Sequence, residues 1–157
     1  IILNHPDYER YEAWGARIAQ SPAAQLILER GADISDCNNQ ALLVERATWG
    51  DVDADWAWNA VFPVTASDGE TYAEAFGELM TSNTGETMAG STVLYEARAG
   101  GSNTHAIAVL SPSFAALNRN LDTLYASDDY EDFLEAVGDS RVLGVRAQSR
   151  HVRTWEP

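Results

Sequence analysis

Three ionisable side chains close to one reversal of the chain have the types needed to move a proton. Glu96 and Arg98 come just before the run Gly100-Gly101-Ser102-Asn103, and His105 follows that run. Glycine and asparagine accept the backbone conformations of tight turns, so the run predicts a β-hairpin. With its two middle residues as the loop, Arg98 would lie opposite His105 and Glu96 opposite Ile107.

The three side chains are predicted to share one face, because alternate residues of a strand point the same way. An imidazole titrates near neutral pH, and a carboxylate can orient it for proton transfer or for polarising a carbonyl group. Glu96, Arg98 and His105 are therefore the candidate catalytic residues. The alternative interpretation is a cross-strand ion-pair patch within a dimer interface, and the sequence leaves both open.

A second group of residues has the types that line the pocket of a planar ligand. Trp56, Trp58 and Tyr95 could form an aromatic wall, and Asn59 would supply a polar contact beside it. These four are the candidate substrate-binding residues. Tryptophan and tyrosine also anchor cores and interfaces, which is the alternative role here.

No metal or cofactor site is predicted. His5, His105 and His151 lack the spacing of metal ligands, and the single Cys37 allows neither an internal disulfide nor a thiolate cluster. The sequence contains neither a G-x-S-x-G elbow nor a glycine-rich phosphate loop. One cysteine leaves the cellular compartment open, with the cytoplasm favoured slightly over the periplasm.

The charge of the chain restricts its partners. Its 157 residues carry 24 acidic and 10 basic side chains, all of the latter arginine, for a net charge of −14. A field of that sign repels phosphates, so we expect no nucleic acid and no membrane as partner. No apolar run approaches the roughly 18 residues of a membrane helix, which predicts a soluble protein. The partner that fits best is an apolar or planar aromatic small molecule.

Periodicity predicts alternating strands and helices. A helix opens at Pro6, breaks at Ser21 and stops at Gly31; another begins near Asp68; a third follows Pro112, breaks at Ser127 and stops at Gly138. The helix near Asp68 has a complete apolar stripe, formed by Tyr72, Ala75, Phe76, Leu79 and Met80. Strands are expected near residues 41–49, 56–65, 92–99, 105–111 and 142–155.

An Arg-Ala pair recurs in three of these strands, at Arg46, Arg98 and Arg146, with spacings of about fifty residues. The chain is therefore predicted to contain three βαβ units. Two such units make a ferredoxin-like βαββαβ motif, an α+β fold with an antiparallel sheet and helices on one face. Residues 56–155 would be one complete repeat. Residues 1–49 would be the second half of another, with its first half upstream.

This pattern resembles the dimeric α/β-barrel superfamily, which includes antibiotic-biosynthesis monooxygenase-like and NIPSNAP-like domains. The resemblance rests on the strand with Trp58-Asn59, the Gly100-Gly101 hairpin leading to His105, and the helix broken at Ser127. It implies a barrel closed by a homodimer or by a tandem repeat. It also implies a small-molecule-binding or cofactor-independent monooxygenase-like protein; the alternative is a non-catalytic structural or interaction module.

Overall fold

The computed structural model describes residues 7–32, 41–51 and 55–150. The expectations for Pro6, for Cys37 and for the strand beyond Arg150 lie outside these ranges. The chain divides into two compact units, residues 1–40 and residues 41–157. Each unit is described by itself.

The first unit is a pair of helices, α1 (Tyr8–Gln20) and α2 (Pro22–Ala32). The predicted break is confirmed: the Ser21 hydroxyl accepts a hydrogen bond from the Ala24 amide at 3.3 Å, and Pro22 opens α2. No residue of α1 is buried, and its Tyr11 and Trp14 rings stack with centroids 6.4 Å apart.

The second unit contains one antiparallel sheet. Its strands are β1 (Leu42–Gly50), β2 (Trp58–Ala66), β3 (Ser91–Ala99), β4 (His105–Ser111), β5 (Arg141–Leu143) and β6 (Ala147–Arg150). The spatial order is β1-β3-β4-β2-β5, and β6 also pairs with β2. Apart from β1, which adds to the β3 edge, this is the order of a ferredoxin-like βαββαβ motif. The predicted fold class is confirmed.

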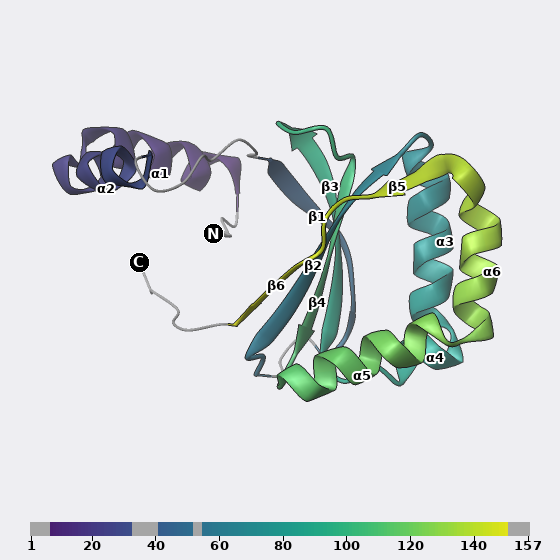
Figure 1. The fold of residues 1–157 in the computed structure, drawn as a ribbon. Helices are drawn as coiled ribbons and strands as arrows, with labels where there is room; N and C mark the ends of the chain where they lie inside the picture. The colour runs from purple at the N-terminus through teal and green to yellow at the C-terminus, as the bar shows by residue number, and fades with distance from the viewer. Residues whose placement is uncertain (1–6, 33–40, 52–54, 151–157) are drawn as a thin grey trace. The chain divides into compact units, whose positions relative to one another are not determined.

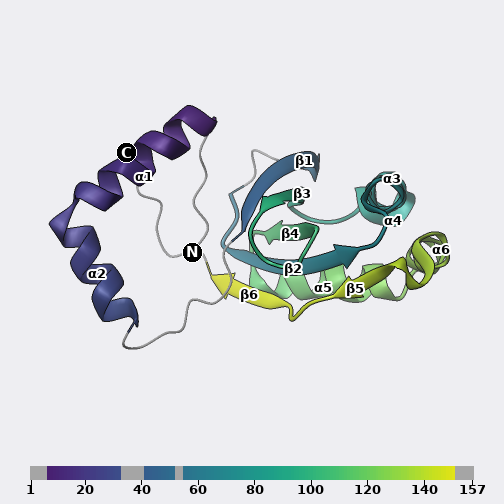
Figure 2. The same ribbon diagram turned by 90° about the horizontal axis from the view of Figure 1, so that it is seen from above.

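Helices cover one face of this sheet (Figure 1). They are α3 (Gly69–Thr81), α4 (Asn83–Glu86), α5 (Phe114–Tyr125) and α6 (Asp128–Val137), followed by a 3-10 turn at Gly138–Ser140. Seen from above, strands β1 and β2 are bowed (Figure 2).

The core lies between the sheet and these helices. All five residues of the stripe predicted for α3 are buried in it, together with Leu117, Leu121 and Phe133 of α5 and α6. The Asp68 carboxylate begins α3 by accepting from the Thr71 amide at 3.1 Å, and Ser127 begins α6 in the same way. The sequence periodicity therefore identified the helices that build the core.

The last strand is not continuous, contrary to the prediction for residues 142–155. It pairs with β2 as two short pieces, β5 and β6, separated at residues 144–146. The break lies where Pro63 of β2 faces it: the Pro63 carbonyl accepts from the Gly144 amide at 2.8 Å, but proline has no N–H to return. The missing donor explains the interruption.

Residues 42–50 belong to the sheet of the second unit, since β1 pairs with β3 along its whole length. That residues 1–49 form half of a second repeat stays a prediction. Among the described residues, no helix has the length and apolar character needed to cross a membrane.

Candidate functional site

The hairpin of β3 and β4 places Glu96 directly opposite His105. The predicted register, with Arg98 opposite His105 and Glu96 opposite Ile107, is wrong by two residues. The turn is longer than the predicted Gly101-Ser102 loop, because the Ala97 amide donates to the Thr104 carbonyl at 2.8 Å and residues 100–103 lie beyond it. Gly100 and Gly101 both take positive φ there.

The register error leaves Glu96 and His105 on one face, because a shift of two residues returns each strand to the same side, whereas Arg98 stands at an irregularity of β3. Glu96, His105 and Ile107 do lie on the face that the helices cover. Thr104 fixes the end of the hairpin by bonding to β2: its amide donates to the Val64 carbonyl at 2.9 Å. This bond holds the start of β4 against β2 beside the turn.

His105 is deeply buried, with 4% of its surface exposed. Its Nδ1 lies 2.9 Å from the Thr104 hydroxyl, which also accepts from the Ala66 amide at 2.9 Å. Its ring lies beside Tyr72, with centroids 5.4 Å apart. Among the described residues, Nε2 has no hydrogen-bond partner. Nε2 is thus the nitrogen left free to exchange a proton.

The electrostatic surroundings keep this imidazole neutral near pH 7. Burial lowers the pKa of His105 below its ordinary value of 6.5, and the Arg46 cation acts in the same direction. The carboxylates of Glu96 and Glu70 oppose that change without reversing it. A neutral imidazole can accept a proton, which a protonated one cannot.

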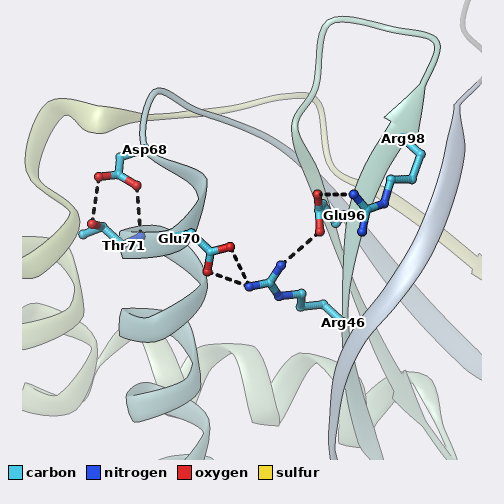
Figure 3. A network of polar contacts seen from close by, with 6 residues as sticks. All are labelled: Arg46, Asp68, Glu70, Thr71, Glu96 and Arg98. Atoms are coloured by element: carbon cyan, nitrogen blue, oxygen red, sulfur yellow. Dashed lines mark hydrogen bonds and ion pairs between the residues drawn. The ribbon is translucent and has the colours of Figure 1, made fainter.

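A chain of ion pairs runs beside the histidine (Figure 3). Glu96 contacts Arg98 through one oxygen and Arg46 through the other, each at 3.1 Å. Arg46 also contacts the carboxylate of Glu70 on α3, at 2.6 and 2.8 Å. Glu96 is the least exposed member, with 25% of its side chain accessible. Arg46 thus connects the edge strand β1 to helix α3 across the site.

Both arginines stand at irregularities in the pairing of β1 with β3. Arg46 has no partner residue between Glu45 and Ala47, and Arg98 has none between Ala97 and Ala99. A β-bulge of this kind re-aims a side chain. The two bulges explain how Arg46 and Arg98 approach Glu96 from different strands.

These groups surround a polar pocket of about 380 Å³. It is lined by Arg46, Ser67, Asp68, Gly69, Glu70, Glu96 and His105. The volume falls in the range of about 300–1,000 Å³ that is usual for small-molecule sites, although the lining is more polar than in most of them. The pocket combines a buried imidazole, carboxylates and a guanidinium, which is a set suited to hydrogen bonding and proton transfer.

Gly69 allows the histidine to stand at the wall of the pocket. A methyl group at this position would lie 2.9 Å from Cε1 of His105 and 3.6 Å from Nε2. Any larger residue at the first position of α3 would therefore displace the imidazole.

The candidate substrate-binding residues do not join this pocket. Trp58 lies at the other end of β2, opposite Ser111, and packs on Phe114 with centroids 4.9 Å apart. Asn59 accepts from the Ser149 hydroxyl at 2.7 Å. Tyr95 is the neighbour of Glu96 in β3, so its side chain lies on the opposite face of the sheet. Trp56 lies before the start of β2. The expected aromatic wall beside His105 is absent from the pocket lining.

A second, aromatic-lined cavity lies within the core between the sheet and the helices. Its walls include Phe62, Phe76, Tyr130, Phe133 and Arg141. Its volume is only about 40 Å³, far below that of usual ligand sites. As it stands, it is a packing gap of the core.

Sequence reasoning missed Arg46, Gly69 and Glu70 as site residues. The recurrence of Arg46-Ala47 and Arg98-Ala99 pointed to equivalent strands, but nothing in the local sequence marks a bulge. Glu70 comes two residues after Asp68, near which the helix was predicted to begin, so its place in the first turn of α3 was foreseeable. Among the described residues, no three acidic, histidine or cysteine side chains gather as a metal site would require.

Comparison with known proteins bears on the fold. No protein-family model and no curated protein sequence matches the chain. A crystal structure from Fusobacterium nucleatum, named "Putative monooxygenase", aligns over 89% of this chain with a TM-score of 0.55 and 13% identity. This chain spans 63% of that protein's length. At 13% identity the likeness is one of fold alone, and it agrees with the predicted α+β class with a ferredoxin-like arrangement.

Two other structures align less well. A Lactobacillus acidophilus protein, named "putative monooxygenase", aligns over 70% of this chain and over 48% of its own length, with 12% identity and a TM-score of 0.47. The structure of a major regulator of staphylococcal pathogenesis aligns over 73% of this chain and 68% of its own, with 12% identity and a TM-score of 0.44.

Proposed function

We propose that this chain is a small-molecule-binding protein whose ligand occupies the polar pocket and exchanges a proton with His105. One observation carries the proposal. A histidine with 4% of its surface exposed has one nitrogen held by Thr104, while the other has no partner among the described residues and the ring lines a pocket of about 380 Å³. Because the ring lines the pocket, a ligand or water that enters it can complete the hydrogen bonding of Nε2.

The chemistry that these residues support is general acid–base catalysis. A neutral His105 would remove a proton from a bound molecule, and the nearby Glu96 carboxylate would stabilise the imidazolium that forms. The fold likeness does not select a reaction, so the proposal rests on the pocket itself.

The test follows the His105 Cε1–H resonance by NMR while three planar molecules of one shape are added: benzamidine, benzamide and benzoate. At least one should shift the resonance of the parent protein. Gly69→Ala, whose methyl group would press on the ring, should abolish or strongly weaken the response.

Gly77→Ala is the matched control on the same helix. A methyl group there has its nearest neighbour, a carbon of Trp49, at 3.8 Å, so the response should be retained. If none of the three molecules shifts the resonance, or if Gly69→Ala and Gly77→Ala respond alike, the proposed binding function is wrong.

A second candidate function, the interaction module, is favoured by the face of the sheet that turns away from helices α3 to α6. Val61, Pro63 and Tyr95 are half-buried on that face, and no helix within residues 41–51 and 55–150 covers it. A second copy of the chain is the proposed occupant. Analytical ultracentrifugation should then find a dimer that Tyr95→Glu dissociates; a monomeric parent would exclude it.

A further inference from the structure

The charges around the polar pocket discriminate between classes of ligand. Asp68, Glu70 and Glu96 contribute carboxylates to its wall, whereas Arg46 contributes the single guanidinium. His105 adds no positive charge, because burial lowers its pKa and leaves it neutral at pH 7. The wall is therefore negatively charged.

The cationic groups that would recognise an anion are already bound. Arg46 contacts Glu70 and Glu96 at the same time. Arg98 lies outside the wall and also contacts Glu96. An anionic ligand would have to compete with these carboxylates for the guanidinium groups, and it would then lie beside carboxylates of its own charge, which repel it.

The positive end of helix α3 is occupied as well. The Asp68 carboxylate accepts from the Thr71 amide at 3.1 Å and from the Thr71 hydroxyl at 2.9 Å. These hydrogen bonds lower the pKa of Asp68, so its carboxylate stays ionised. The helix end is thus neutralised by the protein and is not open to a ligand anion.

The remaining free groups are hydrogen-bond acceptors. Nε2 of His105 is unpartnered among the described residues and, in the neutral ring, presents a lone pair in the tautomer whose Nδ1–H donates to Thr104. Carboxylate oxygens can each accept more than one hydrogen bond, and Glu70 is mostly exposed to solvent. The net charge of −14 also attracts cations over the whole surface.

We propose that the ligand of the polar pocket is a small organic nitrogen cation, such as an amine, amidine or guanidine, whose N–H groups donate to Glu70, Glu96 and His105. The inference deepens the proposed function and rests on it. Charge-assisted hydrogen bonds to carboxylates would supply the selectivity. Of the ligand expected from the sequence, an apolar or planar aromatic molecule, this proposal keeps only the planar shape.

The three planar probes test the charge preference directly, because they share a shape and differ in charge. Benzamidine should bind at least about tenfold more tightly than benzoate at low salt, with benzamide between them. Raising the ionic strength should weaken benzamidine binding and leave benzamide binding unchanged.

Glu70→Gln and Glu78→Gln separate the wall of the pocket from the field of the whole molecule. Both remove one negative charge from α3, but only Glu70 lines the pocket. Glu70→Gln should weaken benzamidine binding severalfold, and Glu78→Gln should leave it close to that of the parent. Circular dichroism checks that both variants fold.

The outcomes distinguish this inference from the proposed function. If benzamide or benzoate binds at least as tightly as benzamidine, the charge preference is wrong while the binding function stands. If the two glutamine variants behave alike, the pocket wall does not select the cation and the inference is overturned. If no probe shifts the His105 resonance, both proposals are overturned.

Discussion

The first turn of α3 and the rest of that helix face different surroundings. Gly69 and Glu70 line the polar pocket, where charged groups are partly accessible to water. From Tyr72 onward, the inner face of the helix packs among aromatic rings. The centroid of the Tyr72 ring lies 5.9 Å from that of Phe133 and 6.2 Å from that of Phe76. One helix therefore carries stability and candidate function on separate turns, so a substitution on one turn should affect one of these properties and spare the other.

The largest expected effect is in the aromatic part. Phe133→Ala should lower the free energy of unfolding by about 3–5 kcal/mol, because the 4% exposed ring fills the core between Tyr72, Phe76 and Tyr130. Chemical denaturation measures the loss. Phe114→Ala is the control, and it should cost much less because that ring is 49% exposed. Equal losses would contradict the assignment of Phe133 to the core.

In the polar part, His105→Gln should lower stability at neutral pH by only about 1 kcal/mol, the net value of a typical hydrogen bond. The larger expected effect of this substitution is on the pH dependence of the free energy of unfolding. The folded-state pKa of His105 lies below the ordinary 6.5, so the unfolded chain binds more protons between those two values. The free energy of unfolding should therefore fall as the pH is lowered through that window.

His105→Gln should remove this part of the pH dependence. Urea denaturation at several pH values from 7.5 downward measures it in both proteins. An unchanged slope in the variant would assign the dependence to another group.

Arg46→Gln should lower stability only slightly, because its ion pairs are partly exposed and screened by water. It should nevertheless raise the pKa of His105, since a nearby cation disfavours the imidazolium. Glu96→Gln should lower that pKa, because it removes a carboxylate that stabilises the same cation. NMR titration of the ring protons measures both. Shifts of the same sign would contradict the arrangement of charges around the pocket.

The smallest effect is expected at the boundary between the two parts. The Tyr72 hydroxyl is buried and has no partner at hydrogen-bond distance among the described residues; burial raises the pKa of its phenol, and the nearby Arg141 cation opposes that rise. Tyr72→Phe should therefore leave the melting temperature unchanged or raise it slightly. A clear decrease would reveal a hydrogen bond of that hydroxyl in solution.

The same division explains what the sequence could predict. The α3 stripe is a local pattern, and all five of its residues are buried as expected. Glu96 pairs with His105 because the turn is longer than the two-residue loop that the glycines suggested, and so the turn sequence alone selected the wrong register. Local sequence indicates which residues face the core, whereas long-range pairing decides which polar groups meet.

Arg46 shows the same limit more sharply. Its place beside Glu70 and Glu96 arises from a bulge between two strands that lie about fifty residues apart in the sequence. A bulge depends on the fit of one strand to its neighbour, and residue type alone does not predict where it occurs. Trp58 and Tyr95 do not line the polar pocket for a related reason, since they have the residue types of a ligand wall but lie on other parts of the sheet.

The two ends of the sheet share an irregularity that bears on how the protein avoids self-association through its strands. A long, straight edge strand offers a row of unpaired N–H and C=O groups on which another chain can extend the sheet. Here β1 is bent by the bulge at Arg46, and the opposite end is divided into β5 and β6 across from Pro63. Within the described strands, neither end of the sheet therefore presents a long regular template for fibre growth.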